Sequence, residues 1–284
     1  MMNMKHWIWF LTLIRMKYSA DFYKRFSDII VANITTTAPG WMSFLETMAR
    51  NSKRTVKELL MIHYQRPEAR DCKSYQEWIN SGRHVKRGAI GIAVRDAENP
   101  EKVRYLFGIE DTVGEKGPWR FSRMLEPEIM QALQAEYHTN EAFSFPAQIE
   151  YAIGLQIDRY WYDHEQEILD GVMECWKGWD EYAAKLQFLD AAFYSTCYMI
   201  LDRCGYHPQT MYEDREFACV PSFYTPHAMA ALGEAVRAVG DQVLDVIEKT
   251  ITERARNNSI VAEGEQTPSA FLKPKSNKRE MEVR

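Results

Sequence analysis

The sequence has few cysteines, and their spacing excludes two kinds of structural site. It holds five cysteines in 284 residues, and none of them forms a Cys-x-x-Cys pair. An odd number without such spacing argues against a disulfide framework and against a structural zinc site. We therefore expect buried, reduced thiols, as in a cytoplasmic protein.

A long apolar segment near the N-terminus is also missing. The run from His6 to Ile14 is shorter than the roughly 20 residues that a membrane-spanning helix needs. A basic residue precedes it, as in a signal peptide, but residues 15–17 lack the small side chains of a cleavage site. We interpret residues 1–17 as an extension or a packing segment, with a membrane anchor as the less favoured alternative.

The motifs of several enzyme classes are absent. There is no Gly-x-x-x-x-Gly-Lys-Ser/Thr phosphate loop and no Gly-x-Ser-x-Gly elbow. His164 and Glu167 are three residues apart and would share a helix face, but no third metal ligand can be named for them. The sequence therefore predicts a protein that is not an enzyme and that needs no metal or cofactor.

An overall positive charge is missing too, yet cations are concentrated in one stretch. The net charge of −5 argues against a nucleic-acid-binding polyelectrolyte. Residues 50–95, however, carry eleven Lys and Arg against four Asp and Glu, a net charge of +7 that leaves −12 for the rest. Such a cluster is either a solvated face or a surface for phosphates.

Two short helices are predicted inside this basic stretch, each opened by a capping box. Thr55 lies three residues before Glu58, and Ser74 lies three residues before Glu77. In each pair the hydroxyl and the carboxylate can satisfy two backbone N–H groups at a helix start. The first helix ends before Pro67, because proline disfavours a helical residue ahead of it.

Strands are predicted after the second of these helices. Gly82 can end that helix in a left-handed conformation, and a basic turn follows it as far as Gly88. The apolar runs at 90–94 and 103–109 then predict a β-hairpin. A further strand is predicted at residues 119–124.

Several sequence blocks follow one another in this region: Gln65-Arg-Pro-Glu-Ala69, Tyr75-Gln-Glu-Trp78, Gly82-Arg-His-Val-Lys-Arg-Gly88, Gly91-Ile-Ala-Val94 and Tyr105-Leu-Phe-Gly-Ile-Glu-Asp-Thr112. Together they resemble the N-terminal domain of ArdC-type antirestriction proteins, in the version found in mobile-element proteins of Firmicutes. The resemblance implies a single-stranded DNA-binding domain on a mobile element, with a role in protecting incoming DNA from host defence.

The same family carries a C-terminal zinc-peptidase-like domain with His-Glu-x-x-His. The nearest string in this sequence, His164-Glu-Gln-Glu-Ile168, lacks the second histidine. We therefore expect neither bound zinc nor peptidase activity.

Cations and aromatic rings in the basic stretch are the expected DNA contacts, because cations track phosphates and rings stack bases. Tyr75 or Trp78 would stack a base, unless the ring belongs to the core. The cations of the turn are expected to be exposed and to contribute little to stability. The expected phosphate contacts are Arg54, Lys57, Arg66, Arg83, Lys86 and Arg87.

The predicted fold class is α+β, with N-terminal helices and a small antiparallel sheet followed by a mostly helical second half. Helical spacing predicts helices at 19–35, 39–50, 128–137, 146–169, 180–203 and 226–256. The predicted domains are an ArdC-like domain over 18–125, a helical domain over 126–256 and a disordered tail over 257–284.

Two other functions remain open at this stage. The acidic remainder of the chain could mimic nucleic acid, which would make the protein an inhibitor of a host defence protein such as a restriction or CRISPR nuclease. It could also be a structural adaptor with no activity alone. The sequence does not predict the oligomeric state.

Overall fold

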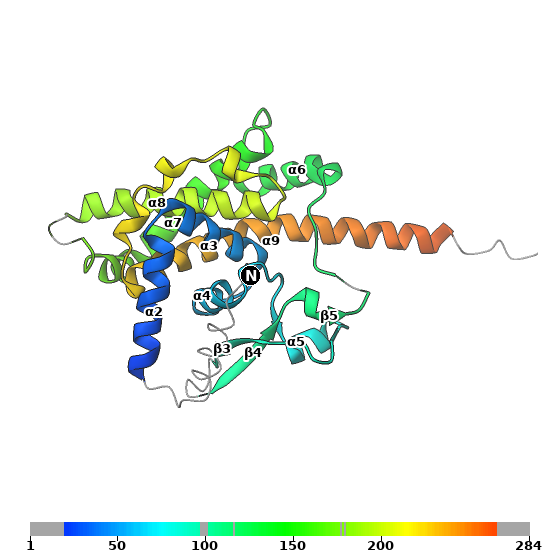
Figure 1. The fold of residues 1–284 in the computed structure, drawn as a ribbon. Coiled ribbons are helices and arrows are strands. Elements are labelled where there is room, and N and C mark those ends of the chain that lie inside the picture. The colour runs from blue at the N-terminus through cyan, green and yellow to red at the C-terminus, as the bar shows by residue number, and fades with distance from the viewer. Residues whose placement is uncertain (1–19, 97–101, 116, 177, 179, 266–284) are drawn as a thin grey trace, which may run out of the picture.

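The computed structural model describes residues 20–96, 102–115, 117–176, 178 and 180–265 (Figure 1). It has the predicted α+β fold, in which helices and a small antiparallel sheet precede a mostly helical second half. The predicted extension at 1–17 and residues 266–284 of the predicted tail lie outside the described residues. In the part of the chain that is described, no helix combines the length and apolarity needed to cross a membrane.

Three helices open the described chain. They are α2 (Ala20–Thr35), α3 (Ala38–Arg50) and α4 (Val56–Gln65). Pro39 lies in the first turn of α3, where a missing N–H breaks no helical hydrogen bond. Helix α4 has the predicted capping box, in which Thr55 and Glu58 each accept a hydrogen bond from the other's backbone N–H.

Two small antiparallel sheets follow α4. Their strands are β1 (Lys73–Ser74), β2 (His84–Val85), β3 (Ile92–Arg95), β4 (Val103–Phe107) and β5 (Thr112–Val113). The predicted hairpin is confirmed, since β3 pairs with β4 and places Ile92 opposite Leu106. Strand β1 adds to the other edge of β4, and β2 pairs separately with β5.

Helix α5 (Tyr75–Asn80) starts at the second predicted capping box. The Glu77 N–H donates to Ser74 Oγ at 3.2 Å, and the Ser74 N–H donates to the Glu77 carboxylate at 2.7 Å. Gly82 follows with a φ of 73°, the left-handed conformation predicted for it. The chain therefore turns directly from α5 into β2.

The prediction of a strand at residues 119–124 is wrong. This stretch is irregular and runs into a short 3-10 turn, Arg123–Leu125. Its Phe121 ring packs 5.2 Å from the Phe145 ring of a second-half helix. The apolar residues of this stretch are therefore explained by packing against the helical second half.

The second half is built from four long helices. They are α6 (Glu126–Tyr137), α7 (Phe145–Val172), α8 (Glu181–Arg203) and α9 (Pro226–Glu265). All four predicted helices are confirmed. Helix α9 projects from the body of the molecule (Figure 1) and continues to Glu265, so it includes the first residues of the predicted tail.

One hydrophobic core joins the two halves of the chain. Trp41 and Phe44 of α3 are completely buried in the same core as Tyr198 of α8 and Val239 of α9. The indole N–H of Trp41 donates to Ser195 Oγ on α8 at 2.8 Å. The predicted domain boundary at 125/126 is therefore not a boundary between hydrophobic cores.

A smaller apolar cluster lies between α4 and the three-stranded sheet. Its buried members are Ile62, Ala69, Cys72, Ile92, Val94 and Leu106. Four of the five cysteines are buried, as predicted, with Cys175 half-buried. The sheet is thus a small unit mounted on one side of a helical body.

Candidate nucleic-acid interface

Two of the predicted phosphate-binding arginines are engaged in ion pairs within the protein. Arg54 donates to both carboxylate oxygens of Glu77, at 3.3 and 2.8 Å. Arg66 pairs with Asp111. Either arginine could meet a phosphate only by sharing or leaving its carboxylate partner.

Arg83 is a structural residue, and the expectation that it is an exposed cation is wrong. It is 9% exposed, and its Nε donates to Thr112 Oγ1 at 2.8 Å. Its Nη1 donates to the Gly114 carbonyl oxygen at 2.7 Å. A side chain at Gly114 would not fit, because a Cβ there would lie 2.8 Å from Arg83 Cγ. Arg83 therefore ties β2 to the end of β5.

Of the two rings expected to stack a base, only one is accessible. Trp78 is 1% exposed, and its indole N–H donates to the Phe107 carbonyl oxygen at 2.8 Å. The Lys73 ammonium lies 4.9 Å from the centre of that ring. Trp78 thus belongs to the interior, whereas Tyr75 is 56% exposed and available to a ligand.

The remaining predicted contacts lie on the surface. Lys57 on α4 and Lys86 and Arg87 in the turn after β2 are all exposed. The Lys86 ammonium donates to the Glu110 carbonyl oxygen at 2.7 Å. These three cations could meet phosphates without any change in the fold.

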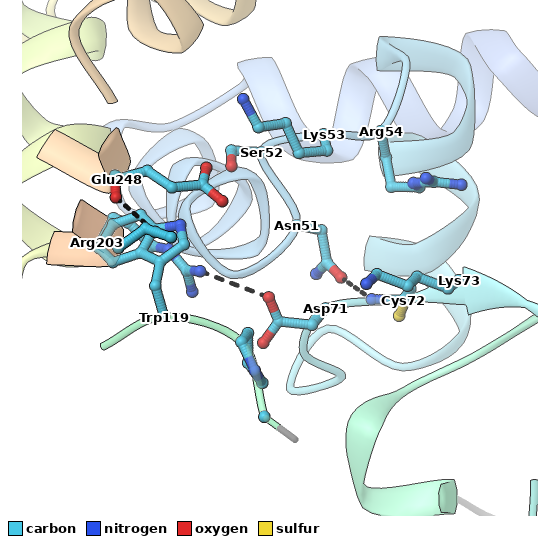
Figure 2. Close-up of a pocket in the computed structure, with 13 residues that line it drawn as sticks. Asn51, Ser52, Lys53, Arg54, Asp71, Cys72, Lys73, Trp119, Arg203 and Glu248 are labelled. Carbon is cyan, nitrogen blue, oxygen red and sulfur yellow. Dashed lines mark hydrogen bonds and ion pairs between the residues drawn. The ribbon is translucent and has the colours of Figure 1, made fainter. Parts of the chain in front are cut away.

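The structure also brings together cations around a groove between the sheet side and the helical body (Figure 2). A cavity of about 350 Å³ is lined by residues 51–54, residues 71–73, Trp119 and Arg203, with α9 contributing its far wall. A neighbouring cavity of about 260 Å³ shares Asp71, Trp119 and Arg203 with the first. We call the two cavities together the Trp119 groove.

More cations than acidic residues line the Trp119 groove, although Lys53 pairs with Asp241 and Asp245, Arg54 with Glu77 and Arg203 with Asp71. The acidic residues of the groove are Asp71 and Glu248. Its cations are Lys53, Arg54, Arg70, Lys73, Arg120 and Arg203. Because the whole chain has a net charge of −5, this is a local concentration of positive charge in an acidic protein.

Asn51 fixes one wall of the groove. This side chain is 3% exposed, and its amide nitrogen donates to the Thr47 and Ala69 carbonyl oxygens at 3.0 and 2.8 Å. Its amide oxygen accepts from the Cys72 backbone N–H at 2.9 Å. The segment from Ala69 to Lys73 is therefore held against the end of α3, and its Asp71 and Lys73 side chains line the cavity (Figure 2).

Arg203 occupies the centre of the groove, at the end of α8. Its guanidinium carbon lies 4.4 Å from the centre of the Trp119 ring, and its Nη2 lies 3.4 Å from Asp71 Oδ1 (Figure 2). Its Nε is buried and has no hydrogen-bond partner among the described residues. Burial raises the pKa of the Asp71 carboxyl, although Arg203 and Lys73 act in the opposite direction.

Sequence reasoning did not single out Trp119, Arg120 or Arg203. A cation in the last turn of a helix is ordinarily explained by the helix dipole, so Arg203 carries no separate signal. Trp119 and Arg120 lay in a predicted strand and are far from Arg203 in the chain. Arg70 and Lys73, in contrast, belong to the basic stretch, and the same charge argument could have included them.

A further cavity, of about 400 Å³, lies between α7 and α9. It is lined in part by His164, Glu167, His227 and Glu234. His164 interrupts the helical geometry of α7 with a φ of −130°, and its ring stacks on Tyr160 at 4.1 Å. Across the residues that the structure describes, no group of three His, Cys, Asp or Glu is arranged to hold a metal ion.

Comparisons of this chain with protein-family models, curated proteins and solved structures gave no match.

Proposed function

We propose that the protein binds single-stranded DNA in the Trp119 groove. One observation carries the proposal: an acidic chain gathers six cations from distant segments around a concave site with an aromatic wall. Positively charged grooves with stacking rings are the usual means by which proteins bind single strands without sequence preference. No enzymatic step is part of this proposal.

The aromatic wall favours a single strand over a duplex. A base can stack on Trp119 only if it is unpaired and turned outward, because a duplex keeps its bases inside. Arg203 lies against the Trp119 ring and would meet the phosphate next to such a base. Cations on both sides of the groove would then follow the backbone in each direction.

The exposed cations of the predicted turn would extend this site. Lys86 and Arg87 are solvent-exposed, as is the Tyr75 ring. We assign them a secondary role, because they lie outside the two cavities of the groove and Arg83 of the same turn is buried.

A change at two exposed arginines of the groove tests the proposal. Each phosphate contact contributes about 0.7 to the slope of log affinity against log salt for a single strand. The double variant Arg70→Ala, Arg120→Ala should therefore flatten the slope by about 1.4 and weaken binding at low salt. The measurement is fluorescence anisotropy of a labelled oligo(dT) over several salt concentrations.

A matched control removes the same charge elsewhere. Arg159 and Arg215 are exposed arginines outside the groove, with side chains 77% and 78% accessible. The double variant Arg159→Ala, Arg215→Ala should keep the slope of the parent protein. Equal slopes for the groove variant and the parent would remove the groove from the binding site.

The resemblance to ArdC-type N-terminal domains supports a biological setting for this activity. In that setting the protein coats incoming single-stranded DNA of a mobile element and shields it from host defence. A transfer assay with and without the protein, in a host with an active restriction system, would test this role.

A second candidate is an inhibitor that occupies the basic channel of a host defence nuclease. The favouring observation is on α7, where Asp158, Asp163, Glu165, Glu167 and Asp170 are all exposed. Such a concentration of exposed carboxylates could mimic nucleic acid. This candidate predicts a stable complex with one nuclease and no affinity for oligo(dT).

A further inference from the structure

Asp71 holds an unusual position in the Trp119 groove. Its φ is 48°, a left-handed conformation that residues other than glycine adopt at an energetic cost. Its backbone N–H donates to the Arg50 carbonyl oxygen at 2.9 Å, so the strained residue is fixed against the end of α3. This conformation directs a carboxylate to the central arginine of a groove that otherwise favours anions (Figure 2).

The contact between Asp71 and Arg203 is weak for a charged pair. Its distance of 3.4 Å exceeds the roughly 2.7–2.9 Å of a strong charge-assisted hydrogen bond. The neighbouring Nε of Arg203 has no partner among the described residues. If Asp71 moves away, Nε and Nη2 of Arg203 would form a pair of N–H groups that a phosphate could take in a bidentate arrangement.

We propose that Asp71 is an autoinhibitory ligand, whose carboxylate occupies Arg203 in the free protein and yields it to a phosphate of the bound strand. This inference rests on the proposed function of the Trp119 groove and adds its regulation. Asp71 lines both cavities of the groove. The apparent affinity for DNA is then the intrinsic affinity multiplied by the fraction of molecules in which Asp71 does not hold Arg203.

The charge environment makes this contact sensitive to pH. Burial raises the pKa of the Asp71 carboxyl, so it gains a proton at a higher pH than an ordinary aspartate. As the pH falls through this raised pKa, Arg203 is released and binding tightens. The other charged groups that line the groove around Asp71 are Lys53, Arg54, Arg70, Lys73, Arg120, Arg203 and Glu248.

Replacing the carboxylate by an amide tests the proposal. Asn tolerates a left-handed conformation and has nearly the same shape, so Asp71→Asn should fold as the parent does. If the pair is closed in roughly 80–90% of molecules, the variant should bind oligo(dT) about five- to tenfold more tightly near neutral pH. Asp71→Gly, which suits the same backbone conformation, should show the same gain.

Asp163→Asn is the matched control. Asp163 is exposed on α7, so this variant removes one negative charge far along the chain from the groove. It should bind like the parent. The affinity of the parent should approach that of Asp71→Asn as the pH falls towards the raised pKa of Asp71, because only the parent can lose the inhibitory charge.

The outcomes separate this inference from the proposed function. If the parent binds oligo(dT) and Asp71→Asn binds no better than Asp163→Asn, the autoinhibitory role is wrong and the groove proposal stands. If the parent, Asp71→Asn and Asp71→Gly all fail to bind at low salt, the groove proposal itself is wrong.

Discussion

At the scale of single residues, Arg83 shows how a cation that seems suited to DNA can belong to the fold. Its guanidinium satisfies Thr112 Oγ1 and the Gly114 carbonyl oxygen. Arg83→Ala should lower the free energy of unfolding by about 1–3 kcal/mol, because it leaves these buried groups without partners. Denaturant melts would measure the change.

Arg87 is the control for Arg83. It belongs to the same turn but is exposed, so Arg87→Ala should change the free energy of unfolding by less than about 0.5 kcal/mol. Equal stabilities of the two variants would show that Arg83 does not tie β2 to β5.

Trp119 is the second residue for which a role in binding can be distinguished from a role in packing. A stacking role predicts that Trp119→Ala weakens oligo(dT) binding by about 1–3 kcal/mol. Trp119→Phe keeps an aromatic face and should retain much of the affinity. Binding would be measured by anisotropy well below the melting temperature, and an unchanged affinity in Trp119→Ala would remove the ring from the site.

At the scale of elements, α5 is the best place to test how local signals stabilise the sheet side. Ser74→Ala removes one half of its capping box and should lower the free energy of unfolding by about 1 kcal/mol. Gln76→Ala, on the exposed face of the same helix, should have little effect.

Glu77, the second residue of this capping box, makes the stability of the fold around α5 depend on pH. Burial disfavours the charge of Glu77, but hydrogen bonds from Arg54 and Ser74 outweigh it and lower the pKa of Glu77 to about 2. A lowered pKa means that the charged form stabilises the fold above the ordinary pKa of 4.5, and that this stabilisation is lost as the pH falls towards 2.

The variant Glu77→Gln tests that sign. It should be less stable than the parent at neutral pH, and the difference should shrink as the pH falls between about 4.5 and 2. Melting temperatures of both proteins across this range would show it. A difference independent of pH would mean that the charge of Glu77 is not what stabilises the helix.

Elements with strong local signals could be predicted from the sequence, whereas pairings that depend on distant residues could not. Capping boxes at Thr55 and Ser74 placed two short helices correctly, because the signal lies within four residues. The strand predicted at 119–124 is wrong, because the Phe121 ring of this stretch packs against Phe145 of α7. The Trp119 groove was missed because its walls come from five separate segments of the chain.

At the scale of the whole molecule, the continuous core makes the two halves depend on each other. Trp41, Phe44 and Leu45 of α3 are fully buried in a core that includes α8 and α9. A fragment of residues 20–125 would expose these side chains and should show no cooperative unfolding transition. Residues 20–265 should unfold in a single step, measured by circular dichroism, whereas a sharp transition in the short fragment would support independent domains.

The central claim is that a single DNA strand lies in the Trp119 groove, and photocrosslinking tests it most directly. An oligo(dT) carrying one 5-iodouracil would be irradiated in complex with the protein, and the crosslinked peptides would be identified by mass spectrometry. We expect the main crosslink at Trp119, and we expect the Arg70→Ala, Arg120→Ala variant to reduce it. Crosslinks confined to Tyr75 or to other residues outside the groove, with Trp119 unmodified, would contradict the account.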